Sequence, residues 1–301
     1  MYSETKTTHS PKSWNRGLHL GLLALVGLLG SACSQKEAPT AVAIGYGADT
    51  FTIGEVLYAD SFNKPEDWVI QIEQNDKSNN EPKAEFANGV LDAYMPARGC
   101  TAWLKQKFEG PIAIVYQVKC PTEYVDGDEI QVRDINNFWH ATDPVAQDRL
   151  FDSELYHGGF GSYHKMHGYY ASTGGGGPNQ SNYTTRFRRY PRQDYQGNDL
   201  AHIALNERDG KEGYLITPDK WHTVQLVAYN GLTQYIVDGK VVYELKEGDP
   251  ISIGKGSEPL KQGTYTFDEF PVHNEGYFGL RMVRTHHLYK DLKIYRLDRK
   301  N

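Results

Sequence analysis

Residues 221–244 read WHTVQLVAYNGLTQYIVDGKVVYE and contain three short apolar segments separated by two turn dipeptides. Asn230-Gly231 and Asp238-Gly239 favour two-residue hairpin turns, because the central residues of such turns need positive φ angles. The flanking segments are rich in Val, Tyr and Thr, which favour strands. The stretch therefore predicts three consecutive antiparallel strands.

The same pattern of strands and turns continues through most of the chain. Another Asn-Gly turn lies at Asn88-Gly89. Residues 112–118 form a strand-like segment whose side chains either alternate between apolar and polar or are apolar on both faces. The chain has 21 Tyr and 30 Gly, a composition that favours sheets and turns. It contains no internal repeat and no amphipathic helix longer than two turns. Strand-like segments about 8 to 12 residues apart are typical of a sandwich, so residues 51–299 are predicted to form one all-β domain.

The first 50 residues differ from this domain and predict an export signal followed by a tether. Basic residues precede an apolar run at 18–29, and the small residues 30–32 lead to Cys33, which is typical of a secretory signal peptide over residues 1–32. Cys33 at the cleavage point resembles the lipobox of bacterial lipoproteins. The resemblance implies lipidation of Cys33, with residues 33–50 as its tether. An ordinary secretory signal with a chance cysteine is the alternative.

The residue after the lipidated cysteine implies a location. Ser34, rather than Asp, follows the cysteine, which in lipoproteins of Gram-negative bacteria implies sorting to the outer membrane. We therefore expect a lipid anchor in that membrane, with the domain facing the periplasm or the cell surface. An exported domain would fold under oxidising conditions, which allow a disulfide between Cys100 and Cys120. Strand register cannot be read from the sequence, so their pairing stays open.

Several stretches resemble known secreted proteins. Residues 221–244 and GYFGLRMVRTHHLYKDLKIYRL (276–297) resemble the end of a concanavalin-like jelly roll. YADSFNKPEDW (58–68) and FANGVLDAY (86–94) are similar to the opening strands of secreted sugar-processing jelly rolls. YYASTGGGGPNQSNYTTRFRRYPR (169–192) resembles an uncharacterised family of bacterial secreted proteins. The resemblance implies a jelly-roll β-sandwich of two antiparallel sheets, similar to polysaccharide lyases and secreted sugar hydrolases of this fold.

Residues 155–193 form a cationic, aromatic stretch in a chain whose formal net charge is −6. They contain no Asp or Glu, whereas their His, Tyr and Arg residues are His157, His164, His167, Tyr156, Tyr163, Tyr169, Tyr170, Tyr183, Tyr190, Arg186, Arg188, Arg189 and Arg192. Such a surface suits an anionic ligand with apolar faces, such as an acidic polysaccharide. The acidic net charge argues against nucleic acid. The alternative is a solvated strand with a basic edge.

Strand alternation sorts the basic residues near the end of this stretch. In a strand over residues 184–190, Arg186, Arg188 and Tyr190 would share one face. Phe187 would point the opposite way. If Phe187 enters the core, the two arginines and Tyr190 face a groove or solvent, where Arg186 and Arg188 could bind substrate carboxylates.

Applied to residues 163–167, the same rule groups Tyr163 with His167 and turns His164 away from them. Either histidine could serve as a catalytic base. The candidates for a catalytic acid are the tyrosines Tyr163, Tyr169 and Tyr190.

Two further segments carry residue types found in sugar sites. Asn136, Asn137 and Trp139 combine amides with an indole, and Arg281 is separated from its apolar neighbours by strand alternation. We expect all four to contact substrate, although the aromatic segment could instead belong to the core. No spacing of His, Cys and carboxylates suggests a zinc site, so no cofactor is expected, and a structural calcium stays open.

These residue types favour elimination over hydrolysis. Glycoside hydrolysis uses two carboxylates across the bond, which the stretch lacks. A polysaccharide lyase instead neutralises a uronate carboxylate, removes the C5 proton and protonates the leaving oxygen, tasks for Arg, His and Tyr. The chain lacks the Gln-Ile-His motif of alginate-cleaving jelly-roll lyases and so departs from that group.

Two other functions remain open. A jelly-roll glycoside hydrolase would depend on carboxylates such as Asp134 or Asp152. A non-catalytic carbohydrate-binding lipoprotein would bind a polysaccharide without turnover. The three are separated by whether His, Tyr and Arg converge within hydrogen-bonding distance.

Overall fold

The computed structural model describes residues 51–74, 80–124, 127–128, 130–176, 180–209 and 215–300, without the side chains of residues 206–209. The predicted signal peptide, the lipidation site Cys33 and the tether lie outside these residues. No helix in the described part of the chain is long and apolar enough to cross a membrane.

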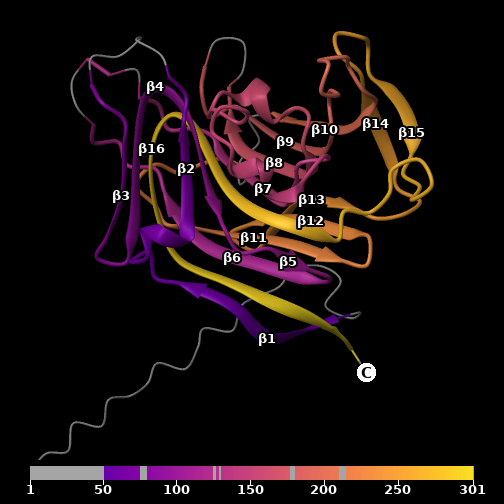
Figure 1. The fold of residues 1–301 in the computed structure, drawn as a ribbon, viewed down its shortest axis with the longest axis horizontal. Coiled ribbons are helices and arrows are strands. Elements are labelled where there is room, and N and C mark those ends of the chain that lie inside the picture. Colours follow the sequence, from indigo (N-terminus) through magenta and orange to yellow (C-terminus); the bar gives the residue numbers. More distant parts are fainter. Residues whose placement is uncertain are drawn as a thin grey trace, which may run out of the picture. The chain divides into compact units, whose positions relative to one another are not determined.

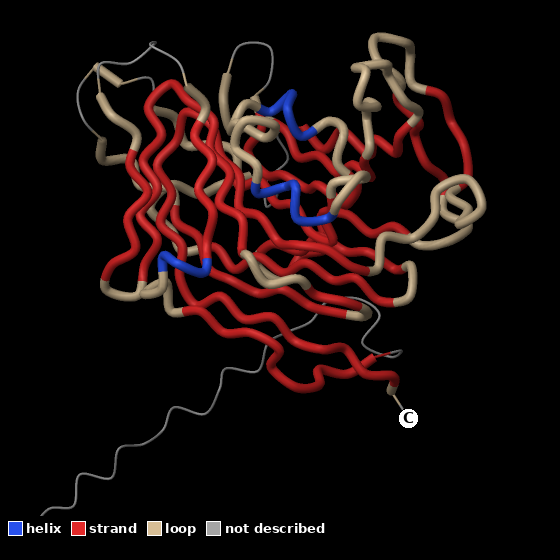
Figure 2. The backbone as a smooth tube through the Cα atoms, in the orientation of Figure 1, coloured by secondary structure: helices blue, strands red, loops and turns tan. Residues whose placement is uncertain are grey.

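Strands make up nearly all of the regular structure, as Figure 2 shows. The first eight are β1 (Phe51–Asp60), β2 (Trp68–Ile72), β3 (Lys83–Ala87), β4 (Val90–Leu104), β5 (Phe108–Glu109), β6 (Ile112–Lys119), β7 (Ile135–Thr142) and β8 (His167–Gly175). The others are β9 (Thr184–Tyr190), β10 (His202–Asp209), β11 (His222–Tyr229), β12 (Leu232–Val237), β13 (Lys240–Leu245), β14 (Pro250–Gly254), β15 (Lys261–Thr264) and β16 (Glu275–Arg299). The helices described are the short 3₁₀ helices η1 (Pro65–Asp67), η2 (Gln147–Phe151) and η3 (Phe160–Tyr163).

The long strand β16 connects the two layers of the fold. Its first half pairs with β7 and with most of β4, whereas its second half pairs with β6 and β1. One layer continues from β7 through β8, β9 and β10, and the other continues from β6 through β11, β12 and β13 (Figure 1). The named strands pair antiparallel throughout. The predicted all-β jelly-roll sandwich is confirmed, and β16 and β4 join its sheets because they bend from one layer to the other.

The turn dipeptides occupy the predicted positions. Asn88-Gly89 joins β3 to β4, Asn230-Gly231 joins β11 to β12, and Asp238-Gly239 joins β12 to β13. Both residues of each pair have positive φ angles, between 46° and 91°. The hairpins form where Asn, Asp and Gly tolerate this backbone conformation.

The main hydrophobic core lies between the layers. It includes Trp139, Tyr169 and Phe187 from one layer and Leu226 and Tyr235 from the other, all at most 1% exposed. We call the face of the β4–β16–β7–β8–β9 layer that meets this core the inner face. The opposite face of that layer is called the outer face.

Candidate functional site

The outer face carries a row of polar side chains across six antiparallel strands, which we call the polar row. Backbone pairing places Gln71 beside Thr101, Thr101 beside Arg281, and Arg281 beside Asn136. Asn136 then lies beside Ser172, and Ser172 beside Arg186. Because side chains at paired positions of neighbouring strands point to the same face, the row Gln71, Thr101, Arg281, Asn136, Ser172 and Arg186 forms one continuous polar strip.

The next row on the same face is largely aromatic. Pairing aligns Trp103, Gly279, Phe138, Tyr170 and Arg188 across β4, β16, β7, β8 and β9. A Cβ at Gly279 would lie 2.6 Å from the ring of Trp103, so the glycine lets this ring lie flat on β16. The polar row therefore borders an apolar platform that ends in a second arginine.

A segment over residues 143–166, which we call the covering segment, packs on this aromatic row. Its Tyr156, Tyr163 and Met166 join Phe138 and Tyr170 in a second hydrophobic cluster. The cluster buries much of the outer face. The polar row beside it is also buried, apart from the partly exposed Arg186. The covering segment is the reason that aromatic side chains occupy both faces of one layer.

Tyr163 is fixed within this cluster by hydrogen bonds. Its hydroxyl donates to Gln71 Oε1 at 2.8 Å and accepts from the Gly158 amide at 3.1 Å. Trp103 Nε1 donates to the same Gln71 oxygen at 3.0 Å. Burial raises the pKa of Tyr163 above its usual value. A fully buried phenol with these partners anchors the covering segment to β2 and β4, and we do not retain it as a proton donor.

Two arginines of the outer face flank the ring of Phe160 in the covering segment. The guanidinium carbon of Arg281 lies 4.8 Å from the ring centre, and that of Arg188 lies 5.9 Å from it. Arg281 Nη1 also donates to the Gly158 carbonyl at 3.0 Å. Cation–π contacts of this kind hold a guanidinium in place without neutralising its charge. Both arginines therefore keep a net positive charge close to the polar row.

His164 lies beside this pair of charges. Arg192 Nη1 donates to His164 Nε2 at 2.9 Å, and the imidazole lies 6.3 Å from the ring of Tyr190. Burial, together with Arg192 and Arg188, lowers the pKa of His164 to about 4. The imidazole is therefore neutral near pH 7 and can accept a proton. His202 has a similarly low pKa of about 4, chiefly because it is buried.

Six buried polar atoms of these rows and of the neighbouring Tyr190 have no hydrogen-bond partner among the described residues. They are Thr101 Oγ1, Ser172 Oγ, Asn136 Oδ1, Arg281 Nε, Arg188 Nε and the Tyr190 hydroxyl. Asn136 is 4% exposed, Arg281 is 2% exposed and Tyr190 is fully buried. Buried polar groups normally have partners, so a set of unpartnered ones on a single face is typical of a place for water or a polar ligand.

Asp134 is a buried carboxylate at the edge of this site. Its Oδ2 accepts from Arg133 Nε at 2.6 Å. Burial raises the pKa of Asp134, while the charges of Arg133, Arg281 and Arg186 act in the opposite direction. The structure thus brings the residue named in the hydrolase alternative close to the arginines named in the lyase hypothesis. Asp152, the other carboxylate of that alternative, is exposed and caps backbone amides of its own turn.

The predicted site residues divide between the two faces. Arg186, Arg188, Tyr190, Asn136 and Arg281 all lie on the outer face, and His164 joins them from the covering segment. Alternation in β9 is as predicted, because Phe187 enters the main core. The other predicted residues lie elsewhere.

Trp139, Asn137 and Tyr169 belong to the inner face and are fully buried. Asn137 Oδ1 accepts from the Tyr116 hydroxyl, and the Tyr169 hydroxyl accepts from the His273 amide at 3.2 Å. A ligand could reach Asn137 and Trp139 only by displacing the core, so contact of these two residues with substrate is not supported. Tyr169, by contrast, lines a pocket of about 390 Å³ together with His140 and His273, away from the outer face.

His167 lies at the edge of the layer, stacked on His273 with 5.6 Å between ring centres. The strand expected over residues 163–167 is wrong, because Phe160–Tyr163 forms a 3₁₀ helix and β8 begins only at His167. The turn lets His164 contact Arg192, whereas His167 points to a different edge. Of the two candidate bases, only His164 is near the polar row.

Phe160 and Gln71 were not predicted, although both organise the site. Phe160 is surrounded by glycines in a stretch that lacks strand alternation, and this pattern is the signal that could have identified an irregular segment there. Gln71 gives no signal in the sequence, because its role depends on the pairing of β2 with β4.

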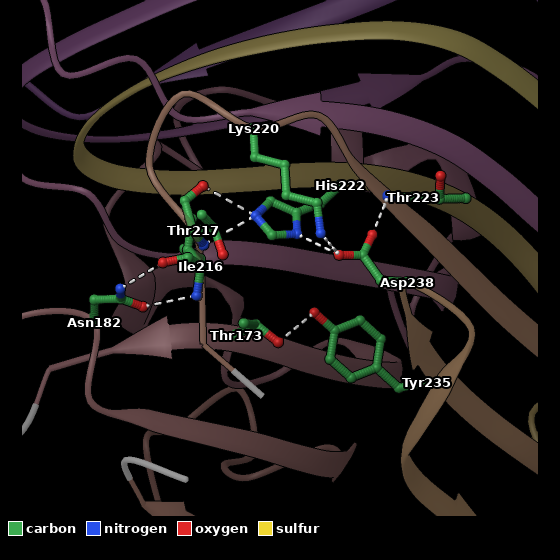
Figure 3. Close-up of polar contacts among 9 residues, drawn as sticks. All are labelled: Thr173, Asn182, Ile216, Thr217, Lys220, His222, Thr223, Tyr235 and Asp238. Atoms are coloured by element: carbon green, nitrogen blue, oxygen red, sulfur yellow. Dashed lines mark hydrogen bonds and ion pairs between the residues drawn. The ribbon is translucent and has the colours of Figure 1, made fainter. Parts of the chain in front are cut away.

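A separate polar cluster surrounds His222 on the other layer (Figure 3). His222 Nδ1 lies 2.9 Å from Asp238 Oδ2, and its Nε2 accepts from the Thr217 amide at 3.0 Å. Burial acts to raise the pKa of Asp238, but hydrogen bonds from His222 and Lys220 outweigh it and lower that pKa well below its usual range. Both ring nitrogens of His222 are engaged, so the cluster fixes the turn at Asp238 and the segment near Thr217.

The two cysteines of the domain are free and buried. Burial raises the pKa of the Cys100 thiol to about 12, so it stays protonated. No group of three metal-ligating side chains is found in the described part of the chain.

Comparisons with known proteins concern mainly the fold. A family model described as "Domain of unknown function (DUF6250)" matches residues 95–256. No curated protein matches the chain. A solved protein of unknown function with a galectin-like fold from Bacillus subtilis is 15% identical, with a TM-score of 0.51, and the match covers 83% of this chain and 100% of that one.

Glycoside hydrolases and carbohydrate-binding modules are also among the structural neighbours. An endo-β-1,3-glucanase from Pyrococcus furiosus is 10% identical with a TM-score of 0.48, over 84% of this chain and 99% of that one. Carbohydrate binding module CBM66 from Bacillus subtilis is 9% identical with a TM-score of 0.42, over 76% of this chain and 95% of that one.

Proposed function

Because the chain belongs to the family described as a domain of unknown function (DUF6250), which assigns no activity, we propose a function from the site itself. The protein binds an acidic polysaccharide along the polar row and cleaves it by β-elimination. The observation that carries this proposal is the set of buried, unpartnered donors and acceptors that Asn136, Arg188, Tyr190 and Arg281 present on one face.

The site's charge favours an acidic sugar as the ligand. Arg281 and Arg188 both lie against the ring of Phe160, and neither guanidinium forms an ion pair with a carboxylate among the described residues. A uronate carboxylate bound there would form charge-assisted hydrogen bonds. The partly exposed ring of Phe160 would meet the apolar face of the sugar ring. Anionic and apolar recognition would thus occur side by side.

The elimination step can be assigned to residues that the fold brings together. An arginine, Arg188 or Arg281, neutralises the uronate carboxylate and so acidifies the C5 proton. Neutral His164 accepts that proton, giving up its hydrogen bond from Arg192. The electron pair of the C5–H bond forms the C4=C5 double bond, and the C4–O bond breaks. The Tyr190 hydroxyl protonates the leaving oxygen.

The hydrolase alternative is favoured by one observation, the raised pKa of buried Asp134. Burial that raises the pKa of a carboxyl group is a common feature of general acids in glycosidases. Glu73 is a second carboxylate to consider, because its Oε2 accepts from the Gly99 amide at 2.9 Å beside Arg281. In this reading Asp134→Asn abolishes turnover and no unsaturated product forms.

The deciding experiment follows ultraviolet absorbance of the conjugated uronate during incubation with polygalacturonate, alginate, chondroitin and hyaluronan. We expect a rise on at least one substrate and its loss in Arg188→Ala, with Arg296→Ala as the matched control. Arg296 lies on the distant half of β16 and pairs with exposed Glu55.

Melting temperatures separate a catalytic loss from unfolding. If Arg188→Ala loses its melting transition, Arg188 is structural and the proposed role is wrong. Binding to a substrate without any absorbance rise or new reducing ends would leave a carbohydrate-binding protein in place of an enzyme.

The location of this activity is part of the proposal. Cleavage before Cys33 and lipidation of its thiol would tether the domain to the outer membrane, where extracellular or periplasmic glycans are accessible. Labelling of cells with radioactive palmitate, compared between the wild type and Cys33→Ala, tests this. Label retained in Cys33→Ala would contradict lipidation at Cys33.

A further inference from the structure

A cavity of about 390 Å³ lies between the two layers, beside the turn that joins β11 to β12, and we call it the interlayer pocket. His140 of β7 and Tyr169 of β8 line it from one layer, and Thr233 of β12 lines it from the other. Phe267 and His273, between β15 and β16, complete the wall. Small-molecule sites have volumes of about 300–1,000 Å³, so this cavity is large enough for a ligand.

The pocket contains a buried imidazole with one unpaired nitrogen. His140 is 2% exposed, and its Nδ1 lies 2.8 Å from the carbonyl oxygen of His273. Burial lowers the pKa of His140 to about 4, so the ring is neutral near pH 7. A carbonyl oxygen only accepts hydrogen bonds, so Nδ1 carries the single proton and Nε2 keeps a lone pair. Nε2 is buried and has no hydrogen-bond partner among the described residues, which makes it an acceptor for a donor on a ligand.

His140 reaches this position through an irregularity of β7. Its φ angle is 45°, and the pairing of β7 with both β8 and β16 changes register at this point. A Cβ at Gly276 would lie 2.4 Å from the backbone carbonyl carbon of His140, and a Cβ at Gly168 would lie 3.0 Å from its oxygen. The two glycines on neighbouring strands thus make room for the irregular backbone. Backbone strain of this kind often occurs at binding sites.

His273 holds the imidazole of His140 in a fixed orientation. The backbone amide of His273 donates to the Tyr169 hydroxyl at 3.2 Å, and its Nε2 donates to the carbonyl oxygen of Tyr190 at 2.9 Å. These bonds attach the segment before β16 to β8 and β9, and the carbonyl of the same residue accepts from His140. The acceptor is therefore preorganised, which lowers the cost of binding a ligand.

The charge of the pocket favours an uncharged ligand. Among the described residues, those that line it include no Asp, Glu, Lys or Arg. Burial and the charge of Arg189 lower the pKa of His273, so both histidines of the wall are neutral near pH 7. A charged ligand would lose its hydration there without gaining a counter-charge. The interlayer pocket thus differs from the polar row, where arginines favour acidic groups.

The rest of the lining combines aromatic rings with amides. A Cβ at Gly231 would lie 2.3 Å from the ring of Phe267, so the glycine lets this ring lie against the β11–β12 turn. Phe267 and Tyr229 are partly exposed, and both line the pocket together with the exposed amides of Asn230 and Asn274. A sugar ring has apolar C–H faces and a rim of hydroxyls, which complement aromatic rings and a few polar groups.

We propose that the interlayer pocket binds an uncharged sugar residue, with one sugar hydroxyl donating to Nε2 of His140. The inference goes beyond the proposed function, because neither uronate recognition nor elimination uses this cavity. The protein then has two carbohydrate sites of different charge preference. The outer face selects acidic sugars, and the pocket between the layers selects neutral ones.

Long-range ¹H–¹⁵N NMR of the histidine-labelled protein observes the imidazole nitrogens directly. The probes are the neutral disaccharides cellobiose, laminaribiose, maltose and lactose, with sodium glucuronate as the charged probe. The Nε2 signal of His140 is assigned by its absence in His140→Asn, and we expect the chemical shift of an unprotonated nitrogen. At least one neutral disaccharide should move this signal towards that of a hydrogen-bonded nitrogen, whereas glucuronate should not.

Calorimetry of the disaccharide that moves the signal tests the residues of the wall. His140→Asn and Phe267→Ala should each weaken binding by about 10-fold or more. Asn tolerates the positive φ angle of His140, and Phe267 is partly exposed, so melting temperatures should show that both variants fold. Tyr124→Ala is the matched control and should bind as the wild type does. Tyr124 is 48% exposed and follows β6, whereas the pocket lies where Pro111 precedes that strand.

Three results would overturn the inference. The first is an Nε2 signal of His140 that no neutral disaccharide moves, and the second is binding that persists in both His140→Asn and Phe267→Ala. The third is binding that is lost in Arg188→Ala instead, which would place the neutral sugar on the outer face.

The same experiments distinguish this inference from the proposed function. Unsaturated product from an acidic polysaccharide, without binding of any neutral disaccharide, would overturn the interlayer pocket alone. Binding of a neutral disaccharide that depends on His140, without unsaturated product from any substrate, would support the pocket and contradict the lyase.

Discussion

The inner and outer faces of β8 and β9 are made by alternate residues of the same two strands, yet they differ in how polar groups are satisfied. On the inner face, the Thr185 and Tyr243 hydroxyls lie 3.0 Å apart, and the Tyr235 hydroxyl donates to Thr173 at 2.9 Å. On the outer face, Arg188 and Tyr190 keep buried polar atoms without partners among the described residues. On the inner face most buried polar groups therefore have partners, with exceptions such as Trp139 Nε1, and this arrangement favours stability. The outer face keeps unpaired groups at the expense of stability, which is typical of a binding surface.

The sharpest test of this contrast is Tyr190→Phe. Removing the hydroxyl should lower turnover by about 10²–10⁴-fold if it protonates the leaving oxygen. The same change should leave the free energy of unfolding unchanged or raise it, because a buried unpaired hydroxyl is lost. Turnover and urea denaturation of the same preparation check both statements. Retained turnover with lowered stability would assign Tyr190 to the core instead.

The inner face should respond in the opposite way. Phe187→Ala should reduce the free energy of unfolding by about 3–5 kcal/mol, because it leaves a cavity in the main core. Phe187→Leu is the milder control and should cost less. Urea denaturation measures the difference in stability. We expect the folded Phe187→Leu variant to bind substrate as the wild type does, and a lowered affinity would contradict the separation of roles between the two faces.

Buried histidines on both faces predict a loss of stability in mild acid. Burial lowers the pKa of His140, His164 and His202 to about 4 and that of His287 to about 3. The unfolded chain, with a His pKa near 6.5, therefore binds more protons than the folded chain between about pH 6.5 and pH 4. The free energy of unfolding should be fully present above this window. It should fall as the pH decreases, by about 1.4 kcal/mol per pH unit for each such histidine.

Urea midpoints measured across this window test the prediction. His287→Gln on the inner face and His164→Gln on the outer face should each reduce the pH dependence. A pH profile that is flat down to the range where carboxylates titrate would contradict the buried, neutral state of these histidines.

The smallest expected effect belongs to the His222 cluster on the other layer. Asp238→Asn keeps the turn, because Asn also tolerates the φ angle of 49°, but it weakens hydrogen bonds to His222 and Lys220. We expect a loss of about 1–2 kcal/mol in stability and no change in turnover. A change in turnover at constant stability would contradict this expectation and would indicate a catalytic role for the cluster, although both ring nitrogens of His222 are already hydrogen-bonded.

Much of the fold could be predicted because it depends on local signals. Asn-Gly and Asp-Gly turns require positive φ angles, and they define three hairpins wherever the flanking segments are apolar. The alternation in β9 could also be predicted, because the charged Arg186 and Arg188 alternate with the apolar Phe187. These features need no knowledge of distant residues.

The rest of the site depends on pairing between strands far apart in sequence. Asn136 meets Arg281 only because β7 pairs with β16, and no local pattern sets that register. Phe138 and Trp139 could not be sorted, because the covering segment buries the outer face and makes both faces aromatic. The position of His167 was predicted wrongly because the prediction assumed a strand over residues 163–167. The 3₁₀ helix at Phe160–Tyr163 breaks that alternation.

The central position of β16 has a consequence for the order in which the domain assembles. It pairs with β1, β4, β5, β6 and β7, all of which precede it in the chain. While the polypeptide emerges during synthesis or translocation, those strands have open edges facing the place of β16. Contacts over such long sequence separations make folding slow. Arg281, which completes the polar row, thus arrives with the strand that closes the sheet, so the proposed binding surface forms only when the whole domain does.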